Sequence, residues 1–315
     1  MTASSEAMAG VTEDWLVELL DLLKGASYDF VTPTPATHAL VRRRRPAREG
    51  SLLRDIFGWT RPFHAAQVDA SLLRLMQAGD LLVETDGFLV SRLRVSTLGG
   101  RYYLHSAPTT DAAAVFLGPD SYRFASLLAR SLKDGKPFRR ALDIGTGAGV
   151  GAITLQDLCP GAEVFASDIN PAALRLAGLN ARHAGLPLRL VEASGLPAAP
   201  ATFDLIVANP PYIAGDTGKT YRDGGDDIGT ALGMDWARSS LDRLSPQGRF
   251  LLYTGAPVIE GRDIVRDALT ALCAERDFSF SYEEIEGDVF GGTLRQAAYQ
   301  DVDRIAAVGA IVQAP

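Results

Sequence analysis

The sequence predicts an α/β fold in which a doubly wound, mostly parallel sheet follows a smaller N-terminal α+β domain. From residue 139 onward, short apolar runs typical of buried strands alternate with amphipathic segments typical of helices. Such alternation predicts parallel strands with helices on both faces. Before residue 105 the pattern differs, because helical segments are followed by a hairpin signal. We therefore expect two domains, over residues 1–105 and 106–315.

The N-terminal domain is expected to resemble a winged-helix unit. Apolar residues recur at helical spacing over 12–24 and again over 67–78. Short strands at 81–83 and 88–90 then flank an Asp-Gly pair, which is a strong hairpin signal. Winged helices often bind DNA, but they also serve as domains that face a substrate or a partner. Because residues 1–110 carry 12 basic and 12 acidic side chains, nothing there attracts nucleic acid in general, and we favour the substrate or partner role.

The segment after residue 139 is expected to supply the main sheet. A helix over 171–184 starts with proline and is followed by glycine, as helices favour. The tail can add an antiparallel pair of strands, 278–284 and 305–313, at one edge. Further helices are expected at 235–244 and 262–275, and further strands at 141–144, 163–166, 188–191, 203–208 and 249–253.

Length, charge and cysteine content limit the class of protein. A chain of 315 residues can bury a large core without disulfides or metals, and its two cysteines and four histidines show no metal-site spacing. No apolar run is long enough to span a membrane, and the first residues do not resemble a secretory signal. The net charge of −7 falls entirely after residue 110, which argues against a bulk nucleic-acid partner. We expect a cytoplasmic protein with no membrane or metal partner.

A glycine-rich loop follows the first strand of the predicted sheet. It contains Gly145, Thr146, Gly147 and Gly149, and glycines let a backbone turn sharply and approach a ligand closely. The dinucleotide-binding pattern would need glycine where Val150 stands, and the Gly-Lys-Ser/Thr ending of a P-loop is absent. The loop therefore indicates a ligand of another kind.

Two acidic residues sharpen this interpretation. Asp143 comes just before the first glycine, where a carboxylate suits a sulfonium cation with an amino-acid tail better than it suits a pyrophosphate. Asp168 ends the next strand, 19 residues after Gly149, and an acid there can accept both hydroxyl groups of a ribose. Loop, acids and spacing together predict S-adenosylmethionine as the cofactor.

An Asn-Pro-Pro-Tyr turn directly follows the apolar strand at 203–208. Ligands of open parallel sheets bind beyond the carboxyl ends of the strands, so this turn is expected beside the glycine loop. Its two prolines remove two backbone donors, which leaves the Asn209 side-chain oxygen and the Pro210 carbonyl free to accept hydrogen bonds from a substrate –NH2 group. We predict that Asn209, Pro210 and Tyr212 are catalytic, with the Tyr212 ring stacked on the flat group, and that Pro211 binds substrate.

Together, segment 143–149, Asp168 and segment 209–212 resemble class I methyltransferases of the small-domain type, over roughly residues 110–313. The branch that looks most similar is the release-factor glutamine N5-methyltransferases, with their N6-adenine relatives. This resemblance implies a seven-stranded sheet whose last strand is antiparallel. It also implies transfer of a methyl group from S-adenosylmethionine to a planar nitrogen, held by Asn209 and the Pro210 carbonyl.

The resemblance adds further residues to the expected site. Segment 116–124 is similar to an Arg-Pro-Asp/Glu-Thr-Glu segment of the family, and Ser194 stands where relatives commonly have an acid after the third strand. The additional contacts expected with the cofactor are Ile169, Ser194 and Asn209. Tyr122 of this segment is expected to contact the substrate, and so is His105, because it lies close to the segment in sequence.

The class of methyl acceptor stays open. A glutamine side chain of a protein, a base of RNA or DNA, and a small-molecule nitrogen all present a flat group that the turn can hold. The resemblance favours protein glutamine, and the acidic balance counts against nucleic acid. Gly118 and Tyr122 replace the family's Arg and Glu, which counts against release factor itself. A winged-helix regulator that only senses S-adenosylmethionine is a further alternative, and the intact Asn-Pro-Pro-Tyr turn counts against it.

Overall fold

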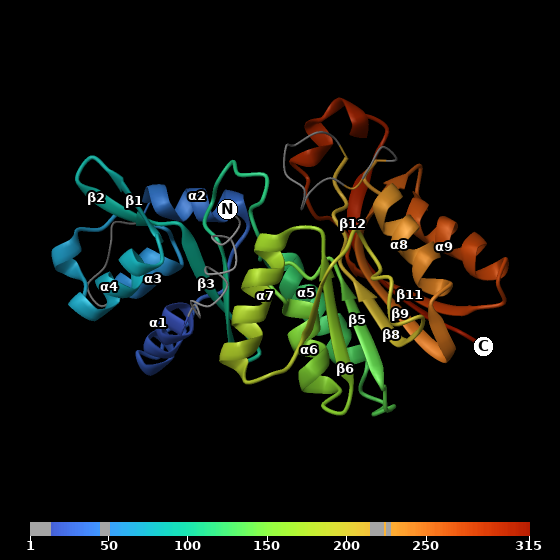
Figure 1. Ribbon diagram of the computed structural model, residues 1–315. Coiled ribbons are helices and arrows are strands. Elements are labelled where there is room, and N and C mark those ends of the chain that lie inside the picture. The colour runs from blue at the N-terminus through green and yellow to red at the C-terminus, as the bar shows by residue number, and fades with distance from the viewer. Residues whose placement is uncertain (1–13, 45–50, 215–223, 225–227) are drawn as a thin grey trace, which may run out of the picture.

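The computed structural model describes residues 14–44, 51–214, 224 and 228–315. A central sheet flanked by helices forms the C-terminal part, and a smaller N-terminal part lies beside it (Figure 1). This is the α/β architecture that the alternation of strands and helices predicts. Within the described ranges, no helix has the length and apolar character needed to cross a membrane.

The sheet has the strand order β11-β12-β9-β8-β5-β6-β7, and a short β10 pairs with β9. Neighbours from β9 to β7 in this order are parallel, whereas β12 is antiparallel to both β9 and β11. The antiparallel pair expected from the tail is therefore confirmed at one edge of the sheet. The strands are β5 (Arg140–Ile144), β6 (Glu163–Asp168), β7 (Arg189–Glu192), β8 (Phe203–Ala208), β9 (Leu244–Ile259), β10 (Arg262–Asp263), β11 (Ser279–Glu286) and β12 (Arg304–Gln313).

Helices cover both faces of this sheet (Figure 1). Successive side chains of a strand point to opposite faces, so in β5 Ala141 faces one apolar cluster and Leu142 faces the other. On the Ala141 side lie α5 (Pro119–Ser131) and α6 (Val150–Leu158), with α7 (Pro171–Ala184) next to them. On the Leu142 side lie α8 (Ala231–Leu241) and α9 (Ile264–Ala274). Short 3-10 turns, η2 (Thr293–Arg295) and η3 (Ala297–Tyr299), precede β12.

The N-terminal part contains the helix and hairpin that the sequence predicts. The predicted helix at 67–78 begins at Ala70, because the Asp69 side chain accepts a hydrogen bond from the Ser71 N–H and caps it. Asp86 and Gly87 both have positive φ, +53° and +77°, as a tight hairpin turn requires. The elements are α1 (Asp14–Gly25), α2 (Pro35–Arg44), α3 (Leu52–Phe57), η1 (Ala65–Gln67), α4 (Ala70–Ala78), β1 (Leu82–Thr85), β2 (Phe88–Ser91), β3 (Leu93–Leu98) and β4 (Arg101–Ser106).

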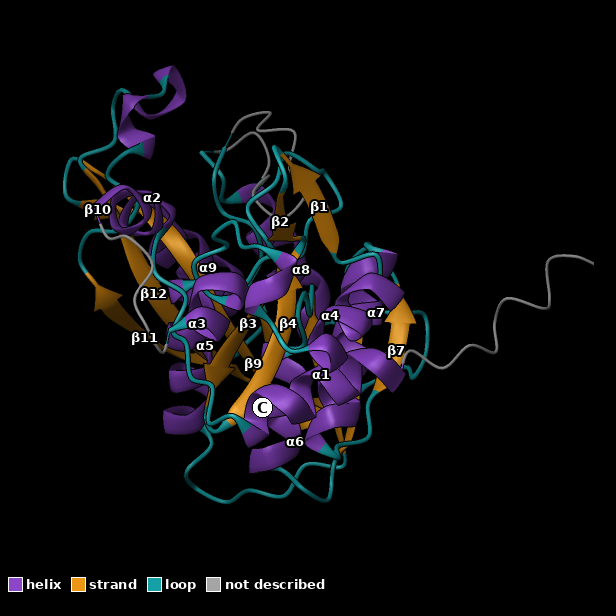
Figure 2. Cartoon of the chain, turned by 90° about the vertical axis from the view of Figure 1, so that its left-hand side faces the viewer, coloured by secondary structure: helices purple, strands orange, loops and turns teal. Residues whose placement is uncertain are grey.

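The two parts share one apolar cluster, formed by α1, the β3–β4 hairpin and α7. Asn180 of α7 is fully buried in this cluster. Its side chain accepts a hydrogen bond from the Leu104 N–H and donates hydrogen bonds to the carbonyls of Leu104 and Ala148. Seen from the side, the N-terminal part lies in front of the sheet (Figure 2). The winged-helix assignment and the domain boundary after residue 105 stay predictions.

Three features differ from the sequence-based expectation. Residues 119–131 form α5, a helix that is not among those predicted from the sequence. The helices α2 and α3 are likewise not predicted. Neither is the β3–β4 hairpin, whose strand β4 is bound through its Leu104 backbone by the distant Asn180. Strand β9 runs over 16 residues instead of the expected short strand, since it pairs with both β8 and β12.

Candidate functional site

The glycine loop and the Asn-Pro-Pro-Tyr turn leave the sheet side by side. Strands β5 and β8 are parallel neighbours, and Ile144 at the end of β5 is paired with Ala208 at the end of β8. Gly145 follows the first of these residues and Asn209 follows the second. The two segments predicted to form a site therefore begin at the same level, at the carboxyl edge where open parallel sheets bind ligands.

The glycine loop has a backbone that only glycine adopts without strain. Gly145, Gly147 and Gly149 have φ values of +65°, +54° and +85°, in the left-handed region that side chains disfavour. A Cβ atom placed on Gly147 would have nothing nearer than 3.9 Å, so this part of the loop has an open side. The Gly149 N–H donates to the Thr146 carbonyl at 2.8 Å. The loop thus presents bare backbone at the carboxyl edge.

Asp143 lies beneath this loop and holds it in place. Its carboxylate accepts hydrogen bonds from the Thr146 hydroxyl at 2.7 Å and from the Ala152 N–H at 2.9 Å. Burial, together with the nearby charge of Asp168, raises the pKa of Asp143 to about 7, although the two hydrogen bonds act in the opposite direction. A Cβ atom on Gly151 would come within 2.5 Å of this carboxylate, so only glycine fits at this position. The sequence alone did not indicate this requirement. Direct contact of Asp143 with a ligand stays a prediction.

Asp168 ends β6 next to the loop. One carboxylate oxygen accepts a hydrogen bond from the Gly147 N–H and the other accepts one from the Asn170 N–H, both at 2.9 Å. A carboxylate has about four acceptor positions, so each oxygen keeps capacity for a further donor, such as the hydroxyl groups of a ribose. Burial raises the pKa of Asp168, against the effect of its backbone hydrogen bonds.

The two neighbouring positions predicted to contact the cofactor lie at the same edge. Ile169 directly follows Asp168, and its side chain is 55% exposed, which is unusual for a large apolar residue. Ser194 is exposed in the loop after β7, and the Ala193 N–H before it donates to the Asp168 carbonyl at 3.1 Å. An apolar side chain and a hydroxyl therefore flank Asp168, which fits a nucleoside.

The Asn-Pro-Pro-Tyr turn offers the predicted acceptors. Asn209 and Pro211 are half-buried, whereas Pro210 is buried, with its ring close to Gly233 of α8. Within the described part of the chain, neither the Asn209 side chain nor the Pro210 carbonyl forms a hydrogen bond. Both oxygens are therefore available to a donor that comes from outside the protein.

Tyr212 has a different environment from the one its predicted role requires. It is buried, its ring covers Gly255, and it makes an edge contact with Phe290 at 5.6 Å between centroids. Burial and the charge of the neighbouring Asp120 carboxylate raise the pKa of Tyr212 well above its ordinary value. This geometry fits a residue that anchors the turn, and stacking of Tyr212 on a substrate stays a prediction.

Sequence reasoning missed the polar group that holds this tyrosine. Asp120, in the first turn of α5, is buried and accepts a hydrogen bond from the Tyr253 hydroxyl at 2.7 Å. Arg123 lies 3.4 Å away and compensates the buried charge. Asp120 lies inside segment 116–124, whose resemblance to the family is the signal that could have found it. Tyr253 comes from the middle of β9, and no local pattern marks it.

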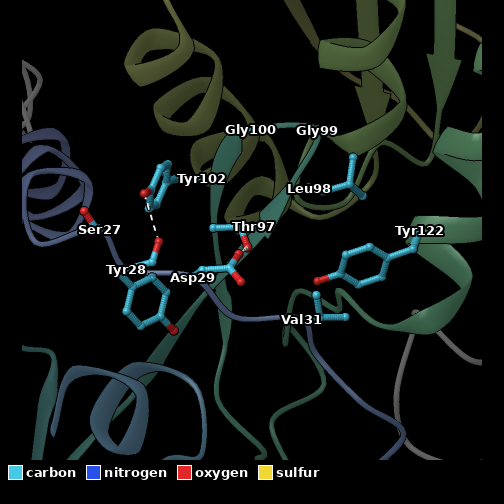
Figure 3. Close-up of a pocket in the computed structure, with 10 residues that line it drawn as sticks. All are labelled: Ser27, Tyr28, Asp29, Val31, Thr97, Leu98, Gly99, Gly100, Tyr102 and Tyr122. Atoms are coloured by element: carbon cyan, nitrogen blue, oxygen red, sulfur yellow. Dashed lines mark hydrogen bonds between the residues drawn. The ribbon is translucent and has the colours of Figure 1, made fainter. Parts of the chain in front are cut away.

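Tyr122 and His105 do not join the turn and the loop directly. The Tyr122 hydroxyl accepts a hydrogen bond from the Thr32 N–H at 3.0 Å, and its ring lines a cavity of about 440 Å³ between the N-terminal part and α5 (Figure 3). His105 is 1% exposed, and its Nε2 lies 2.8 Å from the Ser96 hydroxyl. Burial and the charge of Arg94 lower the pKa of His105 well below its ordinary value, so it is neutral. A substrate contact by His105 would require this packing to open.

Known proteins are similar to the part of this chain that contains the glycine loop and the acceptor turn. Residues 112–251, which contain both the glycine loop and the acceptor turn, match the family described as the methyltransferase small domain. The predicted resemblance is confirmed. A release factor glutamine methyltransferase of Deinococcus radiodurans is 42% identical over 106 residues, which cover 33% of this chain and 37% of that protein. The enzyme of the same name from Lactococcus lactis is 32% identical over 178 residues, covering 52% and 61%.

The match to these methyltransferases is partial. This chain spans 37–48% of the length of the first three curated relatives that it matches, all release factor glutamine methyltransferases. Solved structures are similar as well. One is a 16S rRNA N2 G1207 methyltransferase of T. thermophilus in complex with AdoMet and guanosine. It aligns with 91% of this chain at 16% sequence identity, with a TM-score of 0.48.

Proposed function

We propose that this protein is an S-adenosylmethionine-dependent methyltransferase that acts on a planar nitrogen, with a glutamine amide of a protein as the favoured acceptor. The observation that carries the proposal is the pairing of Ile144 with Ala208. This pairing brings a cofactor-type glycine loop and a turn with free acceptors to one edge of the sheet. The match of residues 112–251 to the methyltransferase small domain supports the same function.

The residues around the glycine loop fit S-adenosylmethionine. The bare backbone of the loop allows close approach, and Asp168 keeps acceptor capacity for two ribose hydroxyls. The exposed Ile169 side chain offers an apolar contact to a flat base, and Ser194 is exposed in the loop after β7. When bound, the cofactor would supply an electrophilic methyl group on a sulfonium.

The acceptor turn would hold the nucleophile. The Asn209 side-chain oxygen and the Pro210 carbonyl accept hydrogen bonds from the two N–H groups of a flat –NH2, which fixes the plane of the group and directs its lone pair. The lone pair of an amide is delocalised and weakly nucleophilic, so positioning and electrostatics account for much of the rate. Tyr212 and Asp120 keep the turn in its place at the sheet edge.

The choice of acceptor rests on two observations. The relatives in the comparison are named as glutamine methyltransferases, and a glutamine amide is a flat –NH2 group that fits the turn. The charge of −7 lies entirely after residue 110, which disfavours long-range attraction of nucleic acid. We propose that the N-terminal part, residues 1–105, selects the acceptor, because it lies beside the sheet and shares a cavity with α5 (Figure 3).

The test has two stages. Calorimetric titration with S-adenosylmethionine is expected to show one binding site. Incubation with labelled cofactor and a cell extract, followed by separation of protein, nucleic-acid and small-molecule fractions, is expected to place the label in protein as methylglutamine. Label in nucleic acid or in small molecules would refute the glutamine acceptor and keep the methyltransferase. Absence of any cofactor binding would overturn the proposed function.

A further inference from the structure

One aromatic side chain lies against the glycine loop without belonging to any motif. Trp236 comes from α8, on the opposite face of the sheet from α5 and α6. A Cβ atom on Gly145 would lie 2.6 Å from its Cη2 atom, and one on Gly195 would lie 3.3 Å from its Nε1 atom. The indole therefore spans from the first loop glycine to the loop that follows β7.

The position of this indole coincides with the nucleoside side of the candidate cofactor site. The Gly195 carbonyl accepts a hydrogen bond from the Ser167 hydroxyl at 2.7 Å, and Ser167 is the residue before Asp168. Gly145 and Gly195 both have positive φ, +65° and +98°, and neither has a side chain that would separate the indole from the backbone. Trp236 is half-buried, so part of the ring stays accessible at this edge.

We propose that Trp236 forms a wall of the cofactor site and contacts the adenine ring, an inference that rests on the proposed function. Ligand sites combine apolar and aromatic walls with a few placed polar groups, and here Asp168 would supply the polar contact to the ribose. Flat aromatic rings gain from offset stacking or edge contact beyond the area that they bury. Trp236 therefore determines affinity for the nucleoside half of the cofactor.

The alternative is that Trp236 only packs α8 against the sheet, since Leu196 and Met234 lie in the same apolar cluster. Two readouts separate these roles. The first is tryptophan emission, because the chain has three tryptophans and only Trp236 lies at the site. The second is the affinity for methylthioadenosine, which has the nucleoside without the amino-acid tail, measured by calorimetry alongside S-adenosylmethionine.

In the wild-type protein, S-adenosylmethionine is expected to change the tryptophan emission. Trp59→Phe is the matched control, since Trp59 packs on Phe30 and His38 in the N-terminal part, and it should keep this change. Trp236→Phe should abolish the change while calorimetric affinity stays within about threefold, because an aromatic wall remains. Trp236→Ala should weaken binding of methylthioadenosine by about tenfold.

Each result decides between the two roles. If wild-type protein binds the cofactor while Trp236→Ala binds methylthioadenosine equally well, the inference is wrong and the proposed function stands. A ligand-dependent emission change that survives in Trp236→Phe would also overturn it, and this readout does not depend on the stability of the alanine variant. If the wild-type protein binds no cofactor at all, the proposed function fails and the inference fails with it.

Discussion

The glycine loop and the Asn-Pro-Pro-Tyr turn are neighbours at one sheet edge, but different kinds of contact hold them. The loop is fixed by residues close to it in the chain, through Asp143 to Thr146 and Asp168 to Gly147. The turn has a neighbour far away in the chain, since the Asp120 carboxylate that acts on Tyr212 comes 92 residues earlier and accepts a hydrogen bond from Tyr253. The motifs of both segments can be read from the sequence, but the contacts that hold the turn form only in the assembled fold.

The largest effect is expected from Asn209→Ala. This variant tests whether the turn acts in methyl transfer while the glycine loop binds the cofactor. Loss of a hydrogen bond that positions the reacting group should reduce kcat by about a hundredfold or more. Affinity for S-adenosylmethionine, measured by calorimetry, should stay nearly unchanged because Asp168 and the loop are untouched. Unchanged turnover in the variant would mean that the acceptor is held elsewhere.

Asp168→Ala is the opposite test, directed at the loop side. Removal of a carboxylate that accepts ribose hydroxyls should weaken cofactor binding by about 10- to 100-fold, the size expected for hydrogen bonds to a charged group. It also removes the acceptor of the Gly147 N–H, so the loop itself should loosen. Calorimetric affinity equal to that of the wild type would remove Asp168 from the site.

Asp143→Asn tests whether the buried carboxyl group beneath the glycine loop makes the stability of the protein depend on pH. The pKa of Asp143 is raised to about 7 in the folded protein and is about 3.9 in an unfolded chain. The folded state therefore binds this proton more tightly, and the group's contribution to stability is lost as pH rises from about 4 through about 7. An asparagine oxygen can still accept from Thr146 and Ala152 but has no charge to bury.

Urea unfolding at pH 5 and pH 8 measures this contribution. Relative to Asp143→Asn, the wild-type protein should lose on the order of a few kcal/mol of unfolding free energy between the two pH values. Parallel pH profiles of the two proteins would contradict the raised pKa.

The smallest effect is expected from Tyr253→Phe, which probes the distant support of the turn. Loss of the hydroxyl leaves the buried Asp120 with one partner fewer and should cost about 1 kcal/mol of unfolding free energy. Turnover of the acceptor should fall severalfold while cofactor affinity is kept. Tyr282→Phe is the matched control, because it removes a tyrosine hydroxyl that donates to Asp263 at 2.7 Å, outside the candidate site. Equal turnover in both variants would separate Tyr253 from the function of the turn.

Elements with a strong local signal were predicted well. The helix at 171–184 has its proline start and its glycine end in both sequence and structure, and the Asp-Gly hairpin turn has the expected positive φ values. The helix α5 is not among the predicted elements, although Phe124 and Leu128 form an apolar stripe on it. Within the site, the roles of Asp143 and Tyr212 as ligand or substrate contacts stay predictions, and the contacts that the structure shows for them lie within the protein.

The sequence by itself determined the alternation of strands and helices after residue 139, the glycine loop with its acidic residues, and the acceptor turn, because each depends on residues that are adjacent in the chain. Tertiary structure alone decided that Ile144 pairs with Ala208, that Asp120 and Tyr253 meet at the turn, and that Trp236 covers Gly145. These contacts join residues tens to more than a hundred positions apart. They form only when the sheet and its two helical layers pack, so no local sequence pattern encodes them.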